Sequence, residues 1–127
     1  MLNVSQEYIN EQIDIQKNEI ERRLKRFRGG KEYHLRGKNI ILVDDGIATG
    51  ATMLAVIKWL GKQNPKRLVV AVPVAPKDTF DKLKEDVKVE DVVVLRLPIA
   101  FSAVGEFYED FSQISDEEVI QIMNKYK

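Results

Sequence analysis

The sequence contains no cysteine, a single histidine and no excess of charge of either sign. Without cysteine, a disulfide framework and thiolate catalysis are excluded, and the composition fits a reducing cytoplasm. With only one histidine besides, a zinc site is not expected. Because 20 basic side chains balance 20 acidic ones, no net field attracts nucleic acid or a membrane surface, and neither is expected as a partner.

Long hydrophobic runs are also missing. No apolar stretch approaches the roughly 20 residues that a membrane-spanning helix needs, and the first 12 residues are polar rather than signal-like. The chain has 127 residues, of which 44% are hydrophobic and 31% charged, a composition typical of a folded globular protein. We therefore interpret residues 1–127 as a single cytoplasmic domain.

Residues 5–28 are predicted to form an amphipathic helix, because apolar residues recur there at helical spacing. Asn3 or Ser5 is the expected N-cap, and Gly29-Gly30 the expected end. The apolar stripe consists of Ile9, Ile13, Ile20, Leu24 and Phe27.

The rest of the chain alternates strand-like and helix-like segments. Strands are predicted at 39–43, 67–74 and 91–97. Helices are predicted at about 52–62, after Asp78 as the expected cap of a short helix with Val87 facing inward, and after a capping box at Ser115–Glu118. The unbroken apolar run 39–43 indicates a strand buried on both faces. This order predicts an α/β fold: three layers, with a mainly parallel sheet flanked by helices, plus the extra N-terminal helix.

The segment after the first strand concentrates the polar chemistry. Ligands of parallel sheets bind beyond the carboxyl ends of strands, where Asp44 and Asp45 stand. Two adjacent carboxylates repel each other, and the hydroxyls of a ribose diol relieve that repulsion by donating hydrogen bonds. The following run Ala48-Thr49-Gly50-Ala51-Thr52 is small, hydroxylated and leads into a helix, which is typical of a phosphate-binding turn. Together the two features match the ends of a ribose 5-phosphate.

The segment Ile40–Met53, IILVDDGIATGATM, resembles the phosphoribosyl-pyrophosphate loop of type I phosphoribosyltransferases. The lead-in Leu35–Lys38 is similar to the one that precedes this strand in the family. The tail Gly105–Glu118 further resembles a subgroup known only as predicted phosphoribosyltransferases. The resemblance covers roughly residue 35 to the end and implies a phosphoribosyltransferase-like fold.

The resemblance implies a role for each matching residue. Asp44 and Asp45 would be the catalytic pair, binding the ribose hydroxyls near an Mg²⁺ that is held mainly through the substrate. The 5-phosphate would be held by Ala48, Thr49, Gly50, Ala51 and Thr52. The expected activity is Mg²⁺-dependent transfer of a phosphoribosyl group from 5-phosphoribosyl-1-pyrophosphate to a nucleobase or related amine. The family's habit suggests a homodimer.

The sequence departs from the family in two places. Ala48 stands where hypoxanthine-guanine enzymes carry a second acid, which disfavours a 6-oxopurine acceptor. Residues 1–37 contain neither a buried-strand pattern nor the glycine-containing pyrophosphate loop that family members place upstream. We therefore expect that the pyrophosphate-loop half is absent, and that this chain alone lacks full transferase activity or needs a partner chain.

Several interpretations stay open from the sequence. The loop 29–37 is either a flap over pyrophosphate or a solvated connector, and Tyr108 either stacks on a base or packs in the core. The chain itself is either an enzyme, a non-catalytic regulatory module that binds the sugar phosphate, or one subunit of a two-chain enzyme. The candidate flap contacts are Arg28, Lys31, Tyr33, His34 and Arg36.

Overall fold

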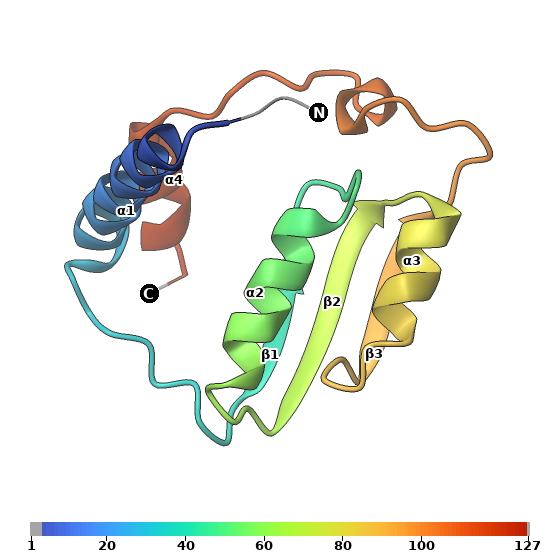
Figure 1. Ribbon diagram of the computed structural model, residues 1–127, viewed down its shortest axis with the longest axis horizontal. Coiled ribbons are helices and arrows are strands. Elements are labelled where there is room, and N and C mark those ends of the chain that lie inside the picture. Colours follow the sequence, from blue (N-terminus) through green and yellow to red (C-terminus); the bar gives the residue numbers. More distant parts are fainter. Residues whose placement is uncertain (1–3, 127) are drawn as a thin grey trace. The chain divides into compact units, whose positions relative to one another are not determined.

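The computed structural model describes residues 4–126, which form two compact units (Figure 1). The helical unit comprises residues 4–33 and 113–126, and the sheet unit comprises His34–Ser112. Within residues 4–126, no helix has the length and apolar character to cross a membrane. The alternative N-cap Asn3 lies outside the described residues.

The helical unit pairs the first and last helices of the chain. Helix α1 spans Gln6–Arg28, and its N-cap is Ser5, whose Oγ accepts a hydrogen bond from the Tyr8 N–H at 3.2 Å. It ends at Gly29, whose left-handed φ of 63° suits glycine. Helix α4 spans Asp116–Asn124 and begins with the predicted capping box. The expected N-terminal helix and the last helix are thus both confirmed.

Ion pairs join α1 to α4. Arg22 Nη1 lies 2.6 Å from Asp116 Oδ2, and Arg26 pairs with Glu117. The hydrogen bond from Arg22 lowers the pKa of the Asp116 carboxyl below its usual value. Within α1, hydrogen bonds from Arg22 and then Arg23 lower the pKa of Glu19 from 4.5 to about 2. These carboxylates therefore stabilise the helical unit in their charged form.

Acidification is expected to loosen the contact between α1 and α4. Because folding lowers these pKa values, the carboxylates contribute stability above their ordinary pKa and lose it as the pH falls toward the folded values, which for Glu19 means from about 4.5 toward 2. The protection factors of the α4 amides, which correct for the intrinsic pH dependence of exchange, should therefore fall across that range. In the Arg22→Ala variant the α4 amides should exchange faster already at neutral pH, and their protection should depend less on pH. Arg23 bonds Glu19 within α1, so the α4 amides of Arg23→Ala should exchange as in the wild type. Equal pH profiles in wild type and Arg22→Ala would contradict this assignment.

The sheet unit is a parallel three-stranded sheet with helices between its strands. Strands β1 (Asn39–Val43), β2 (Arg67–Val74) and β3 (Asp91–Arg96) lie in that order, all parallel. Helices α2 (Ala51–Gly61) and α3 (Lys77–Lys84) connect them and lie over one face of the sheet (Figure 1). The predicted parallel sheet with flanking helices is confirmed.

The core of the sheet unit lies between β2 and the two crossover helices. Leu68, Val70, Val72 and Val74 of β2 alternate inward, as expected of a strand under helices. Helix α2 contributes Met53, Ile57 and Leu60, helix α3 contributes Leu83, and β3 contributes Val92.

Two expectations about burial are wrong. Ile41 and Val43 of β1 are 67% and 68% exposed, because both crossover helices cover the opposite face of the sheet. Val87 is 98% exposed, because α3 already ends at Lys84. Asp78 lies in the first turn of α3 rather than at its cap, which is Pro76.

An aromatic segment follows β3 and contains one short 3-10 turn, η1 (Val104–Phe107). The rings of Phe101 and Phe107 stack with centroids 5.4 Å apart, and those of Tyr108 and Phe111 lie 5.1 Å apart. The Tyr108 hydroxyl donates a hydrogen bond to the Asp45 carbonyl, with the oxygens 2.5 Å apart. The segment therefore packs beside the residues that follow β1.

Candidate functional site

Residues 44–50 connect the carboxyl end of β1 to the start of α2 and are anchored in the core. Ile47 is only 3% exposed, and its N–H donates to the Val74 carbonyl at the end of β2 at 3.0 Å. One buried side chain and one hydrogen bond to the neighbouring strand therefore hold the middle of this loop, while Asp44, Asp45, Ala48 and Thr49 are exposed.

Two glycines let the loop approach its neighbours closely. A Cβ on Gly46 would stand 2.6 Å from Val104 and 2.9 Å from Val74. A Cβ on Gly50 would stand 2.9 Å from Thr79 Cγ2, and the φ of Gly50, +79°, is one that side chains disfavour. The loop can follow this path only because both positions lack a side chain.

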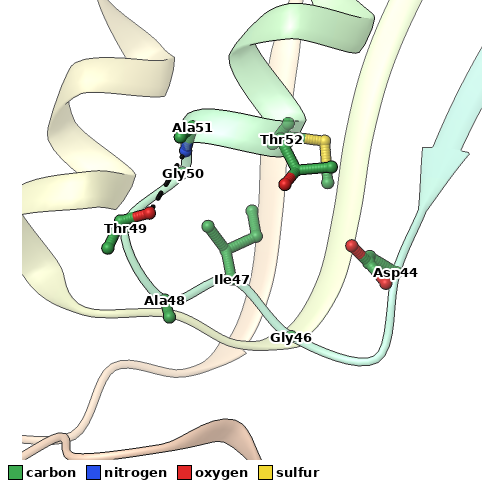
Figure 2. A pocket seen from close by; sticks show the side chains of 9 residues that line it. Asp44, Gly46, Ile47, Ala48, Thr49, Gly50, Ala51 and Thr52 are labelled. Atoms are coloured by element: carbon green, nitrogen blue, oxygen red, sulfur yellow. Dashed lines mark hydrogen bonds between the residues drawn. The ribbon is translucent and has the colours of Figure 1, made fainter. Parts of the chain in front are cut away.

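The loop encloses a small hollow of about 170 Å³ at the start of α2 (Figure 2). In Figure 2 the Asp44 carboxylate and the Thr52 side chain lie on different sides of the loop interior. Asp44 and all five predicted phosphate-binding residues line this hollow, which we call the loop hollow. Its lining residues are Asp44, Gly46, Ile47, Ala48, Thr49, Gly50, Ala51, Thr52 and Met53.

The N-terminus of α2 makes the loop hollow attractive to an anion. Gly50 is the N-cap and offers no side-chain hydrogen bond to the helix. The first internal helix bond runs from the Leu54 N–H to the Gly50 carbonyl at 2.8 Å, so the N–H groups of residues 51–53 precede the helical ladder. Only the Ala51 N–H has a local contact, 3.4 Å to Thr49 Oγ1. Unpaired N–H groups at the positive end of a helix dipole form an anion site.

The two adjacent aspartates take different positions. Asp44 lines the loop hollow, and its Oδ1 accepts a hydrogen bond from the Asp45 N–H at 3.0 Å. Asp45 is exposed and is not among the lining residues, so the structure brings one of the two predicted carboxylates directly to the hollow. One carboxylate and a set of helix N–H groups thus share one small space, and the binding roles predicted for these residues stay predictions.

Thr79 of α3 is a site residue that sequence reasoning missed. It is 4% exposed, and its Oγ1 donates to the Ala48 carbonyl at 3.0 Å. Nothing in the local sequence KDTFDKLK singles it out, because its position against the loop depends on how α3 packs. For Tyr108 the sequence left base stacking and packing open; in the structure its ring packs on Phe111 and its hydroxyl bonds the loop.

A second, larger hollow adjoins the loop. It has a volume of about 500 Å³, and Ala48 and Thr49 line both spaces. We call it the neighbouring hollow. It combines an aromatic ring with polar and charged side chains, and its lining residues are Ala48, Thr49, Pro76, Asp78, Thr79, Lys82, Phe101 and Ser102.

Two of the candidate flap residues contact each other. The Arg28 guanidinium lies 4.1 Å from the centroid of the Tyr33 ring, and Arg28 Nε lies 3.5 Å from the Lys31 carbonyl oxygen. Both contacts lie within the helical unit. A role of the loop 29–37 over pyrophosphate stays a prediction.

No group of three or more acidic or histidine side chains suited to a metal ion occurs in residues 4–126. The acidic donors at the loop are Asp44 and Asp45. Such a pair fits an Mg²⁺ ion that takes one or two protein carboxylates and fills its other positions with substrate oxygens and water.

The sequence of this chain is similar to a known protein family. The sequence profile of the phosphoribosyl transferase domain matches residues 3–110, which is most of the chain. The chain belongs to this family. The match includes the loop hollow, α3 and the aromatic segment through Tyr108, and the predicted family membership is confirmed.

Individual relatives extend the comparison. Two proteins of Mycobacterium tuberculosis, from strains CDC 1551 and H37Rv, are named provisionally as phosphoribosyl transferases; each is 38% identical over 108 residues. The match covers 84% of this chain but 24% of each relative. The crystal structure of TT1426 from Thermus thermophilus has a TM-score of 0.73 at 35% identity, covering 97% of this chain and 58% of that one. The chain thus spans about a quarter of the curated relatives' length and somewhat over half of the solved relative.

Proposed function

We propose that this chain binds 5-phosphoribosyl-1-pyrophosphate in the loop hollow and takes part in transferring the phosphoribosyl group to a nucleobase or related amine. The observation that carries this proposal is the placement of the Asp44 carboxylate and the uncapped N-terminus of α2 around one hollow. The helix N–H groups and the hydroxyls of Thr49 and Thr52 suit the 5-phosphate, and the aspartates suit the ribose hydroxyls.

The proposed reaction exchanges one bond at the sugar. The bond from C1 of the ribose to the pyrophosphate oxygen breaks, pyrophosphate leaves with that electron pair, and the acceptor nitrogen forms a bond to C1 and loses a proton. Positive charge develops on the sugar in between. Asp44 and Asp45 would stabilise that charge, and their hydrogen bonds to the diol would hold the ring in place. Mg²⁺, when bound with the substrate, would offset the charge of the leaving pyrophosphate.

The neighbouring hollow is the proposed place for the acceptor. It opens next to Ala48 and Thr49, so an acceptor there would lie beside a sugar bound in the loop hollow. Phe101 supplies an aromatic surface for a flat ring. Ala48 contributes no acid to this hollow, but Asp78 and Lys82 line it, and the disfavoured 6-oxopurine acceptor stays a prediction.

Binding and turnover test the proposal separately. We expect isothermal titration of the full chain to show binding of ribose 5-phosphate and of 5-phosphoribosyl-1-pyrophosphate with Mg²⁺, and no measurable binding of ribose at the same concentrations. Equal binding of ribose would contradict a site built around the phosphate. No binding of any sugar phosphate would refute the proposed function.

We expect the isolated chain to bind 5-phosphoribosyl-1-pyrophosphate but to catalyse the transfer slowly or not at all. Pyrophosphate release should be slow or absent with a panel of nucleobases, because described residues 4–38 hold one helix and a loop and no strand with a pyrophosphate loop. Rapid release by the chain alone would show that this expectation is wrong. Tight binding without any turnover favours the regulatory module, and turnover only after adding a partner polypeptide favours the two-chain enzyme.

A further inference from the structure

Thr79 stands out chemically within the sheet unit. It is the one buried polar side chain in the part of the chain that the structure describes, and its hydroxyl bonds a loop carbonyl rather than a neighbour in α3. Valine has the same shape and would bury more favourably at a purely structural position. We therefore expect the Thr79 hydroxyl to have a role at the loop whose carbonyl it binds.

The carbonyl held by Thr79 belongs to the peptide between Ala48 and Thr49. A trans peptide is planar, and its C=O and N–H point in opposite directions. A hydroxyl that fixes the Ala48 carbonyl toward α3 therefore fixes the Thr49 N–H away from α3. Thr49 lines the loop hollow, as do its neighbours at the start of α2.

Tyr108 holds a second peptide in the same way. Its hydroxyl donates to the Asp45 carbonyl at 2.5 Å, which sets the direction of the Gly46 N–H. Gly46 also lines the loop hollow. Between these two points, the Ile47 N–H is already engaged by the Val74 carbonyl at 3.0 Å. The loop is thus held by one donor on each side of its buried anchor.

We propose that Thr79 and Tyr108 are positioning residues that orient the N–H groups of Thr49 and Gly46 into the loop hollow before an anion binds. This inference rests on the proposed function, because it assigns these hydroxyls to the same site. Neither side chain lines the loop hollow, and each acts through a loop carbonyl. The benefit is preorganisation: the N–H groups do not have to reorient when the phosphate arrives.

Substitutions at Thr79 separate the hydroxyl from the packing. Thr79→Val keeps the shape and removes the donor, whereas Thr79→Ser keeps the donor and removes the methyl that packs near Gly50. We expect Thr79→Val to bind ribose 5-phosphate about tenfold more weakly, in line with the loss of one oriented hydrogen bond. Thr79→Ser should recover most of the affinity, although it disturbs the packing more.

Amide NMR gives a separate signal for each N–H group, so it distinguishes a change in one N–H orientation from a loss of overall stability. On titration of the wild type with inorganic phosphate, the amide signals of Gly46, Thr49, Thr52 and Met53 should shift. In Thr79→Val the Thr49 response should be lost while those of Thr52 and Met53 persist. In Tyr108→Phe, which keeps the ring on Phe111, the Gly46 response should be lost. Tyr126→Phe, at a tyrosine that is 85% exposed in the other unit, is the matched control and should behave as the wild type.

The outcomes distinguish this inference from the proposed function. If the wild type shows no response in residues 46–53 and binds no sugar phosphate, the proposed function fails and the inference fails with it. If the wild type responds and both Thr79→Val and Tyr108→Phe keep the full amide response and affinity, the positioning roles are refuted and the function stands. If Thr79→Val does not fold, the Gly46 response in Tyr108→Phe decides alone.

Discussion

Replacing Asp44 and Asp45 together with asparagine is expected to weaken binding of ribose 5-phosphate by roughly 100-fold or more. Hydrogen bonds to a charged group contribute about 1.5–3 kcal/mol each, and two are lost in their charged form. The lost affinity should come from the contacts with the ribose hydroxyls. Binding of inorganic phosphate to the N-terminus of α2 should survive or strengthen, because two negative charges beside the anion disappear.

Comparison of two sugars makes this prediction sharper. The wild type should bind 2-deoxyribose 5-phosphate more weakly than ribose 5-phosphate, and in the double variant the two should bind equally, as in a double-mutant cycle. The control is Glu11→Gln with Asp14→Asn, which removes two exposed charges from α1 and should leave binding unchanged. If the double variant at the loop still distinguishes the two sugars, the aspartates do not bind the diol.

Gly50→Ala is expected to lower the free energy of unfolding of the sheet unit by at least about 2 kcal/mol and to abolish phosphate binding. An alanine at the φ of +79° costs about 1–2 kcal/mol, and its Cβ would stand 2.9 Å from Thr79 Cγ2, which adds an overpacking cost. Relief requires α3 or the loop to move, and either movement displaces the start of α2. Urea unfolding followed by the fluorescence of Trp59, the single tryptophan, reports on this unit.

Two other glycines separate the conformational cost from the contact cost. Gly37 has a φ of +69° and open space where a Cβ would stand, so Gly37→Ala should show the conformational cost alone and leave phosphate binding intact. Gly46→Ala lacks the positive φ but would meet Val104 at 2.6 Å, so it should show the contact cost. Gly50→Ala combines both costs and should therefore be more destabilising than Gly37→Ala. If it is no worse than Gly37→Ala, the close approach of Thr79 to the loop is not a real constraint.

Much of the fold could be predicted from the sequence because the local signals agree. The helix ends at Ser5 and Gly29, the capping box at Ser115 and the alternating strand β2 all depend on neighbouring residues along the chain. Burial of β1 was mispredicted because an apolar run does not record which face the crossover helices cover. Ile41 and Val43 therefore look like buried residues in the sequence and are exposed in the structure.

The residues of the loop itself could be identified from the sequence, whereas those that reach it from distant segments could not. Asp44 and residues 48–52 lie within nine consecutive positions, and all of them line the loop hollow, while the roles predicted for them stay predictions. Thr79 and Tyr108 reach the same loop from 31 and 63 residues away, and no local pattern marks them. Asp45 stands next to Asp44 in the sequence, yet it lies outside the lining because the chain turns between them.

The sequence by itself determined the family and the alternation of strands and helices. It also contains a ten-residue run, 44–53, whose residue types suit a sugar and a phosphate. Each of these features depends on residues close together along the chain. Only the tertiary structure decided which carboxylate faces the hollow, which sheet face stays open and which distant hydroxyls hold the loop. Those features depend on how α3 and the segment after β3 pack against the end of β1, and packing between distant segments leaves no periodic pattern in the sequence.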